Sequence, residues 1–194
     1  MTAVRRAAGA VLALLATALA AGETPPLTYQ VEPALTNAGF AVAQFGVLRQ
    51  YGRFERIGGT IVLDPDGDAG RVDLAIATAS VTTGWEARDD FIRGESMFDA
   101  ARYPEVRFRS LRLDYVDARL VGVDGEVTLR GVTRPMHLDV HDVQCGLAAG
   151  GGRDGCRARV VGRLSRAAFG MHFGYPLIGD DVEFDFAIMA LRAP

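Results

Sequence analysis

Three histidines are candidates for metal binding or proton transfer in this chain. His137 and His141 alternate with apolar residues and lie four residues apart on one face of an expected strand. At the rise of a β-strand they are about 13 Å apart, which is too far to share one metal ion. His172 stands in a loop beside aromatic residues, where we expect a structural role. The histidines therefore predict no metal site.

Paired carboxylates could support acid–base chemistry at Asp89-Asp90 and at Asp180-Asp181. Both pairs stand in helix or turn contexts, where exposed or capping carboxylates are usual. No Ser/His/Asp spacing and no phosphate-binding loop stands out, so no catalytic residue and no cofactor is assigned. Catalytic triads form in space rather than along the sequence, which leaves a hydrolase open as an alternative.

Cys145 and Cys156 are the two cysteines of the chain. A glycine-rich stretch over residues 146–155 separates them and is typical of a loop that joins two strands. In an oxidising compartment two such cysteines are expected to form a disulfide across the hairpin. A metal site would need more ligands than two thiols, and none stand nearby.

The first twenty residues have the organisation of a secretory signal peptide. Arg5 and Arg6 precede an apolar run at 7–19, which is too short to span a bilayer comfortably. Ala18 and Ala20 fit the −3 and −1 positions of a cleavage site. The sequence predicts a signal peptide over 1–20 and a mature domain over 21–194 that is periplasmic or secreted, with an uncleaved anchor as the alternative.

The net charge bears on the partners. Loss of residues 1–20 removes two arginines and moves the net charge from −3 to −5 (−3 minus 2), which argues against nucleic acid. All 21 lysine-plus-arginine positions are arginine, which fits either phosphate recognition or genome composition.

Apolar and polar residues alternate along much of the mature chain, as in antiparallel strands with one wet face. The clearest segments are 72–76, 121–129, 136–141, 157–164 and 182–188. Residues 64–68 read as a hairpin turn, the apolar phase switches after Ser110 as at a β-bulge, and 85–98 reads as a short helix. Together they predict an all-β fold, an eight-stranded antiparallel barrel.

Such a barrel can be filled by side chains or can hold one ligand, and the sequence leaves both open. The inward phases carry almost no charge, so a cavity would be apolar. They also include small residues that leave room: Ala38, Gly59, Thr78, Gly125, Ala158 and Gly162.

Five motifs occur in the order found in one protein family. The most specific combines residues 80–84 (SVTTG), 88–89 (RD), 97–99 (MFD) and 103–108 (YPEVRF). The others are 52–54 (GRF) with 59–64 (GTIVLD), 125–135 (GEVTLRGVTRP), 165–171 (SRAAFGM) and 180–182 (DDV). Through them the chain, over residues 28–192, resembles the YceI-like family, exported lipocalin-like barrels that bind polyisoprenoids.

The resemblance implies an extended lipocalin-like barrel with a short helical insert and an apolar tunnel for an isoprenoid chain, such as a quinone tail or a polyprenyl phosphate. The chain departs from the family in its first strand, where Asp-x-x-His-Ser and a later histidine are typical. Glu32, Leu35, Thr36 and Gln44 occupy those places, so both histidines are absent and their head-group contacts are not carried over.

The sequence analysis thus predicts a non-enzymatic exported protein that sequesters or transports an isoprenoid lipid. Transient membrane contact and a homodimer are further partners left open. The alternatives are an enzyme acting on a small apolar substrate in the same cavity, and a filled barrel that binds a partner. Alternation predicts the ligand-binding lining: Phe40, Val42, Ile61, Leu63, Leu74, Ile76, Phe108, Phe184 and Phe186.

Overall fold

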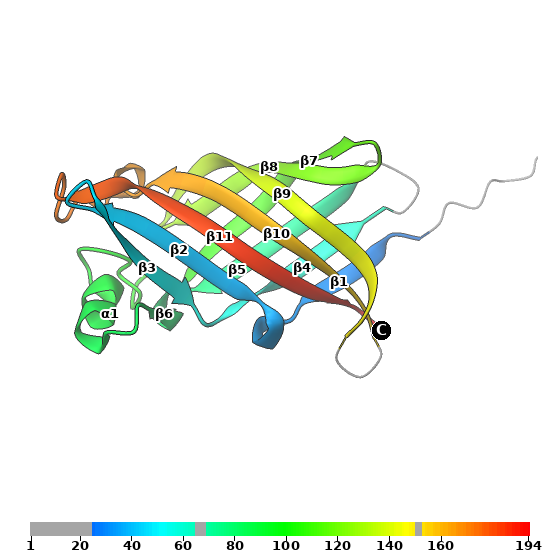
Figure 1. The fold of residues 1–194 in the computed structure, drawn as a ribbon, viewed down its shortest axis with the longest axis horizontal. Coiled ribbons are helices and arrows are strands. Elements are labelled where there is room, and N and C mark those ends of the chain that lie inside the picture. The colour runs from blue at the N-terminus through cyan, green and yellow to red at the C-terminus, as the bar shows by residue number, and fades with distance from the viewer. Residues whose placement is uncertain (1–24, 65–68, 150–152) are drawn as a thin grey trace, which may run out of the picture.

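The computed structural model describes residues 25–64, 69–149 and 153–194, and these residues form one all-β domain (Figure 1). The predicted signal peptide and its cleavage site before Ala21 lie outside the described residues. The strands are β1 (Leu27–Val31), β2 (Asn37–Gln44), β3 (Leu48–Phe54), β4 (Ile57–Leu63), β5 (Gly70–Ala77), β6 (Val81–Thr82), β7 (Glu105–Val116), β8 (Arg119–Leu129), β9 (Val132–Ala149), β10 (Arg153–Ser165) and β11 (Ile178–Arg192). One α-helix, α1 (Glu86–Arg93), follows β6. Among the described residues, none of the helices has the length and apolar character needed to cross a bilayer.

The sheet closes into an eight-stranded antiparallel barrel. The closed circuit runs β1-β4-β5-β7-β8-β9-β10-β11, and β1 pairs with β11 to complete it. β11 also pairs with β2, so the last strand of the domain lies beside both β1 and β2. The all-β barrel with a short helical insert, predicted from the sequence, is confirmed.

Three of the eight strand positions are interrupted, which the sequence analysis did not predict. β1 continues into β2, β3 into β4, and β5 into β6, with the 3-10 helices η1 (Pro33–Leu35) and η2 (Thr78–Ser80) in two of the breaks. Pro33 has no N–H for the ladder, which accounts for the first break. The backbone N–H groups of Glu55 and Arg56 donate to the carbonyl and the hydroxyl of Ser80, both at 3.0 Å, which joins the other two breaks.

The predicted alternation is confirmed on β9, whereas on β8 it breaks at Val121, which is exposed beside a register shift. Leu138 and Val140 are buried on β9, whereas His137 and His141 are exposed. The predicted bulge is also present, because the β7–β8 register shifts between Ser110 and Arg112. The predicted hairpin over 64–68 is consistent with the direct pairing of β4 with β5, although residues 65–68 lie outside the described part of the chain.

One half of the barrel is filled by its own side chains. This is the end where β1 and β4 complete the circuit, near the C-terminus in Figure 1. The inward side chains there are almost fully buried and pack as one cluster, so this half is a conventional core. They include Tyr29, Val31, Ile57, Val72, Leu113, Val123, Ile188 and Ala190.

The predicted disulfide between Cys145 and Cys156 is present. The two residues face each other in the β9–β10 register, with their Cα atoms 4.1 Å apart. The loop prediction was too long, because β9 extends to Ala149 and β10 begins at Arg153. The ladder continues past the disulfide, where residues 147–149 of β9 pair with residues 153–155 of β10.

Replacement of both cysteines by serine should lower the free energy of unfolding by at most about 3 kcal/mol, because the bridge closes a short loop in the unfolded chain. Denaturant titration of the oxidised protein and the double variant measures the difference. Ligand binding should change little, since neither cysteine borders the cavity described below. Uptake of two equivalents of alkylating reagent by exported protein without reductant would contradict the pairing.

Candidate functional site

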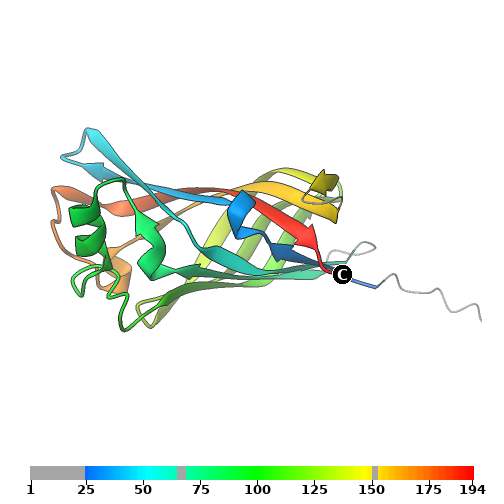
Figure 2. The same ribbon diagram turned by 90° about the horizontal axis from the view of Figure 1, so that it is seen from below.

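The other half of the barrel encloses an apolar cavity of about 240 Å³. It lies at the end where α1 packs beside the strands (Figure 2). Its lining includes the exposed residues Ala43, Tyr51 and Phe91, so the cavity reaches the surface at this end. The question left open by the sequence, a filled or a hollow barrel, therefore has a different answer in each half.

Most of the residues predicted to line a tunnel border this cavity: Phe40, Val42, Leu74, Ile76, Phe108, Phe184 and Phe186. Ile61 and Leu63 do not. They lie on β4 opposite β1, at the filled end, and pack against the core there. Their inward phase was read correctly, but alternation does not tell how far along the barrel axis a residue lies. That the lining binds a ligand stays a prediction.

Three aromatic rings of the lining lie over glycines on neighbouring strands. A Cβ added at Gly162 would stand 2.3 Å from Cζ of Phe184, its partner across the β10–β11 ladder. A Cβ at Gly52 would stand 2.4 Å from Cζ of Phe40. Phe108 covers Gly125 in the same way, at 2.6 Å. The glycines let the rings lie flat along the wall, which keeps the space between them open.

Sequence reasoning missed the part of the lining that comes from the helical insert. Phe91, Ile92, Met97 and Phe98 all border the cavity. Phe98 packs edge-on against Phe54 with ring centroids 5.5 Å apart. The signal was available, because residues 97–99 belong to the most specific motif of the chain. Alternation with a period of two residues describes strands only, so it predicts nothing about the helix and the turns that follow it.

Asp89 anchors the insert to the barrel. Its carboxylate accepts hydrogen bonds from the backbone N–H of Thr83 (2.7 Å), the Thr83 hydroxyl (2.6 Å) and the Thr82 hydroxyl (3.1 Å). Burial alone would raise the pKa of Asp89, but these hydrogen bonds outweigh it and hold the pKa below its usual value. Asp89 is thus a structural anion that holds the insert against β6 and the residue that follows it.

Replacing Asp89 with asparagine should lower the free energy of unfolding by roughly 1 to 3 kcal/mol at neutral pH, because charge-assisted hydrogen bonds are lost. The folded-state pKa lies below the unfolded value, so this stability is present above about pH 4 and disappears as the pH falls through the lowered pKa. The free energies of unfolding of the wild-type protein and of Asp89→Asn should therefore converge in acid. Asp90→Asn is the matched control, since Asp90 only forms an exposed pair with Arg93 and should cost under about 0.5 kcal/mol. Equal losses for the two variants would contradict the anchor.

Polar groups are few in the lining, and two of them are arginines. Arg166 is almost fully buried and donates to the carbonyls of Met171 (2.7 Å), Ile178 (2.8 Å) and Gly179 (2.8 Å). Its burial lowers the pKa of the guanidinium, an effect that nearby Asp180 partly offsets. Arg166 therefore holds the chain that follows β10.

Arg88 is the other arginine of the lining, and it projects from α1. Its Nη1 donates to Oε1 of Gln50, and the guanidinium lies 5.2 Å from the Trp85 ring centroid. The lining residues that the structure describes include no carboxylate, imidazole or thiol. The cavity is thus apolar with a positive edge.

Exposed apolar side chains surround the open end of the cavity. Phe45, Val47 and Leu48 lie at the β2–β3 turn, and Phe173 and Leu177 lie in the segment before β11. The Phe45 N–H donates to the Leu177 carbonyl at 2.6 Å, and the Phe173 ring lies 4.6 Å from that of Phe91 on α1. Both ribbon views place these three segments at the same end of the molecule (Figures 1 and 2). We call this set the apolar rim.

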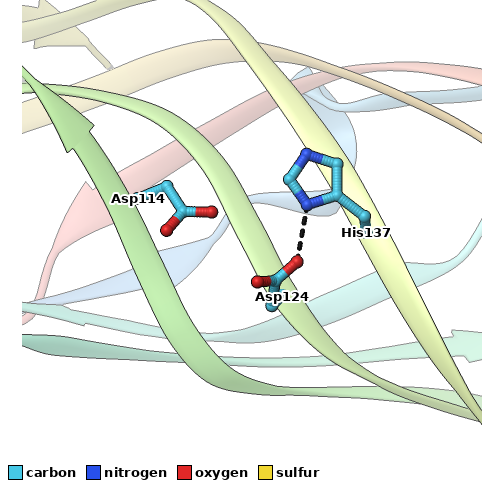
Figure 3. Close-up of side chains that lie close together, drawn as sticks. All are labelled: Asp114, Asp124 and His137. Atoms are coloured by element: carbon cyan, nitrogen blue, oxygen red, sulfur yellow. Dashed lines mark hydrogen bonds and ion pairs between the residues drawn. The ribbon is translucent and has the colours of Figure 1, made fainter.

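A second group of side chains lies on the outer face, where Asp114, Asp124 and His137 approach one another within 4.8 Å (Figure 3). Arg112 already binds both carboxylates at 2.5 Å, and Nδ1 of His137 lies 2.6 Å from Asp124. The hydrogen bond with Asp124 raises the pKa of His137, while the same bond and that from Arg112 lower the pKa of Asp124. We interpret the group as an exposed salt-bridge network, because a metal ion would have to displace Arg112.

Comparison with known proteins gives one consistent family. The YceI-like domain matches residues 29–190. A UPF0312 protein of Photorhabdus laumondii is 32% identical over 135 residues, which cover 68% of this chain and 67% of that protein. The fold matches the crystal structure of Burkholderia cenocepacia BcnA with a TM-score of 0.69 at 22% identity, covering 82% of this chain and 98% of BcnA. It also matches a polyisoprenoid-binding domain from Saccharophagus degradans, with a TM-score of 0.63 at 20% identity over 86% of this chain and 99% of that domain.

Proposed function

The chain belongs to the YceI-like family, and from this premise we propose that it is an exported protein that sequesters or transports an isoprenoid lipid in its cavity. The observation that carries the proposal is the cavity itself, which opens at one end and is lined almost wholly by apolar side chains. Burial of an apolar chain contributes roughly 25 cal/mol per Å² of surface removed from water. A prenyl tail offers such surface along its whole length.

Binding is favoured over catalysis by the chemistry of the lining. Acid–base or nucleophilic catalysis needs a titratable group within reach of the substrate. Among the described lining residues the polar groups are two amides, the hydroxyls of Thr83 and Tyr51, and two arginines. The Thr83 hydroxyl donates to Asp89, Arg166 is held by backbone carbonyls, and the described lining offers the Tyr51 phenol no carboxylate or imidazole as a partner. We therefore propose no catalytic residue and no cofactor.

Export and membrane contact belong to the same proposal. Residues 1–20 support secretion to the periplasm or beyond, and the intact mass of the exported protein should correspond to a start at Ala21. The apolar rim supports transient contact with a membrane, because exposed apolar side chains in a cluster mark interaction sites. A homodimer stays open, and sedimentation of the exported protein would report it.

Native mass spectrometry of protein purified from its own host tests the proposal. We expect one isoprenoid per chain, a quinone or a polyprenyl phosphate, which tandem fragmentation identifies. A small apolar compound that co-purifies with the protein and is converted to a product supports an enzyme instead. An empty cavity, with a partner protein bound to the outside, supports a partner-binding barrel. Either of these results overturns the carrier.

A further inference from the structure

Arg88 is a cation for which the described part of the protein supplies no counterion. Several arginines on the outer face pair with acids, as Arg49 does with Glu183 and Arg159 with Asp185. Arg88 forms no salt bridge with any described residue, and its neighbour Asp89 is bound to Thr82 and Thr83 instead. Its positive charge therefore faces the cavity edge without a carboxylate.

The guanidinium also has an unused donor. Nε of Arg88 is buried, yet it has no hydrogen-bond partner, and it is the one such side-chain atom among the described residues. Buried polar atoms in folded proteins are nearly always paired, so an orphan at a cavity edge points to a partner that arrives with the ligand. The Trp85 ring and the Gln50 carbonyl oxygen hold the guanidinium in place.

Gln50 adds donors at the same place. Its Oε1 accepts from Arg88, which leaves the two N–H donors of the amide for another acceptor. Arg88 and Gln50 both border the apolar cavity. A guanidinium beside an amide donor suits the oxygens of a phosphate or a carboxylate, since charge-assisted hydrogen bonds to anions are the strongest that arginine makes.

We propose that Arg88, with Gln50, binds an anionic head group of the ligand at the open end of the cavity, so that the protein prefers a prenyl phosphate to a neutral lipid with the same tail. This inference rests on the proposed function and deepens it. It assigns a head-group site to residues from α1 and β3; Leu35 on η1 does not border this cavity, whereas Gln44 on β2 does.

Trp85 is the only tryptophan of the chain and lies against Arg88, so its fluorescence reports on this site. The probes are geranylgeranyl phosphate and geranylgeraniol, which share one tail, together with inorganic phosphate. Wild-type protein should bind the phosphate roughly 10- to 100-fold more tightly than the alcohol, the range expected for hydrogen bonds to a charged group. Inorganic phosphate alone should not compete, because it lacks the tail.

Arg88→Gln should remove this preference, because the affinity for geranylgeranyl phosphate falls far more than that for geranylgeraniol. Arg88→Lys should keep part of it, because the charge remains while the planar fork is lost. Arg56→Gln is the matched control, since Arg56 is exposed and does not border the cavity. A wild-type protein without preference, a preference that survives in Arg88→Gln, or full competition by inorganic phosphate overturns the head-group site while the carrier stands. A wild-type protein that binds neither prenyl probe overturns the proposed function and the site together.

Discussion

Replacing Gly162 with alanine is expected to lower lipid occupancy sharply while the barrel stays folded. The new Cβ would stand 2.3 Å from Cζ and 2.6 Å from Cε2 of Phe184, so the ring must leave the wall and turn into the cavity. A ligand can then enter only by forcing the ring back against the new methyl group. Overpacking of this kind costs roughly 1–3 kcal/mol, which corresponds to about 5- to 150-fold in affinity.

The measurement is the bound fraction in native mass spectra, with circular dichroism to check the fold. Gly58→Ala is the matched control, because a Cβ there meets nothing within 4 Å, and it should leave occupancy unchanged. The double variant Gly162→Ala/Phe184→Leu should recover binding, since the shorter side chain no longer meets the methyl group.

The contact of Phe40 with Gly52, on the adjacent strands β2 and β3, allows a second test. Gly52→Ala should displace Phe40 in the same way, and Phe184→Trp or Phe40→Trp should fill the cavity directly. Phe184→Asp should abolish binding through an unpaired charge in the lining, but it also threatens the fold. If the folded glycine and tryptophan variants all retain full lipid occupancy, the ligand does not lie in this half of the barrel.

The largest loss of stability is expected for Arg166→Met. The guanidinium is 2% exposed and donates to three backbone carbonyls, so its removal leaves buried acceptors without a donor. We expect the free energy of unfolding to fall by about 3 to 5 kcal/mol in denaturant titrations. Ligand binding should weaken as well, because Met171 and Ile178 border the cavity.

Two further variants test the role given to Arg166. Arg166→Lys should recover only part of the stability, because an ammonium group cannot reach three carbonyls as a planar guanidinium does. Arg163→Met, at an exposed position nearby, should change stability by under about 0.5 kcal/mol. A loss for Arg166→Met no larger than that for Arg163→Met would contradict the structural role.

Much of the wall could be predicted from the sequence, because alternation records which side chains share a face. It placed Phe40 and Phe184 inward on the first and last strands, and the register makes them direct partners. It could not separate Ile61 from Leu74, since both face inward and differ only in their height along the barrel. Height depends on strand pairing and on breaks such as that at Pro33, which are tertiary features.

The polar end of the cavity lay beyond sequence reasoning for a related reason. Arg88 and Gln50 are 38 residues apart and meet only because β3, β6 and α1 come together. The ring-over-glycine contacts likewise depend on cross-strand register, as between Phe184 and Gly162. The small size of inward glycines such as Gly125 and Gly162 predicts empty space beside them, whereas in the structure aromatic rings fill that space.

The filled half of the barrel gives the cavity a floor, because the described inward side chains beyond Phe186 and Val160 pack together. A cavity that opens at one end would admit a prenyl lipid with its tail first and release it with its head group first. A donor and an acceptor would therefore have to use the same face of the protein in turn. If the protein carries a lipid as proposed, it would have to move back and forth between donor and acceptor, and it could not form a continuous channel between them.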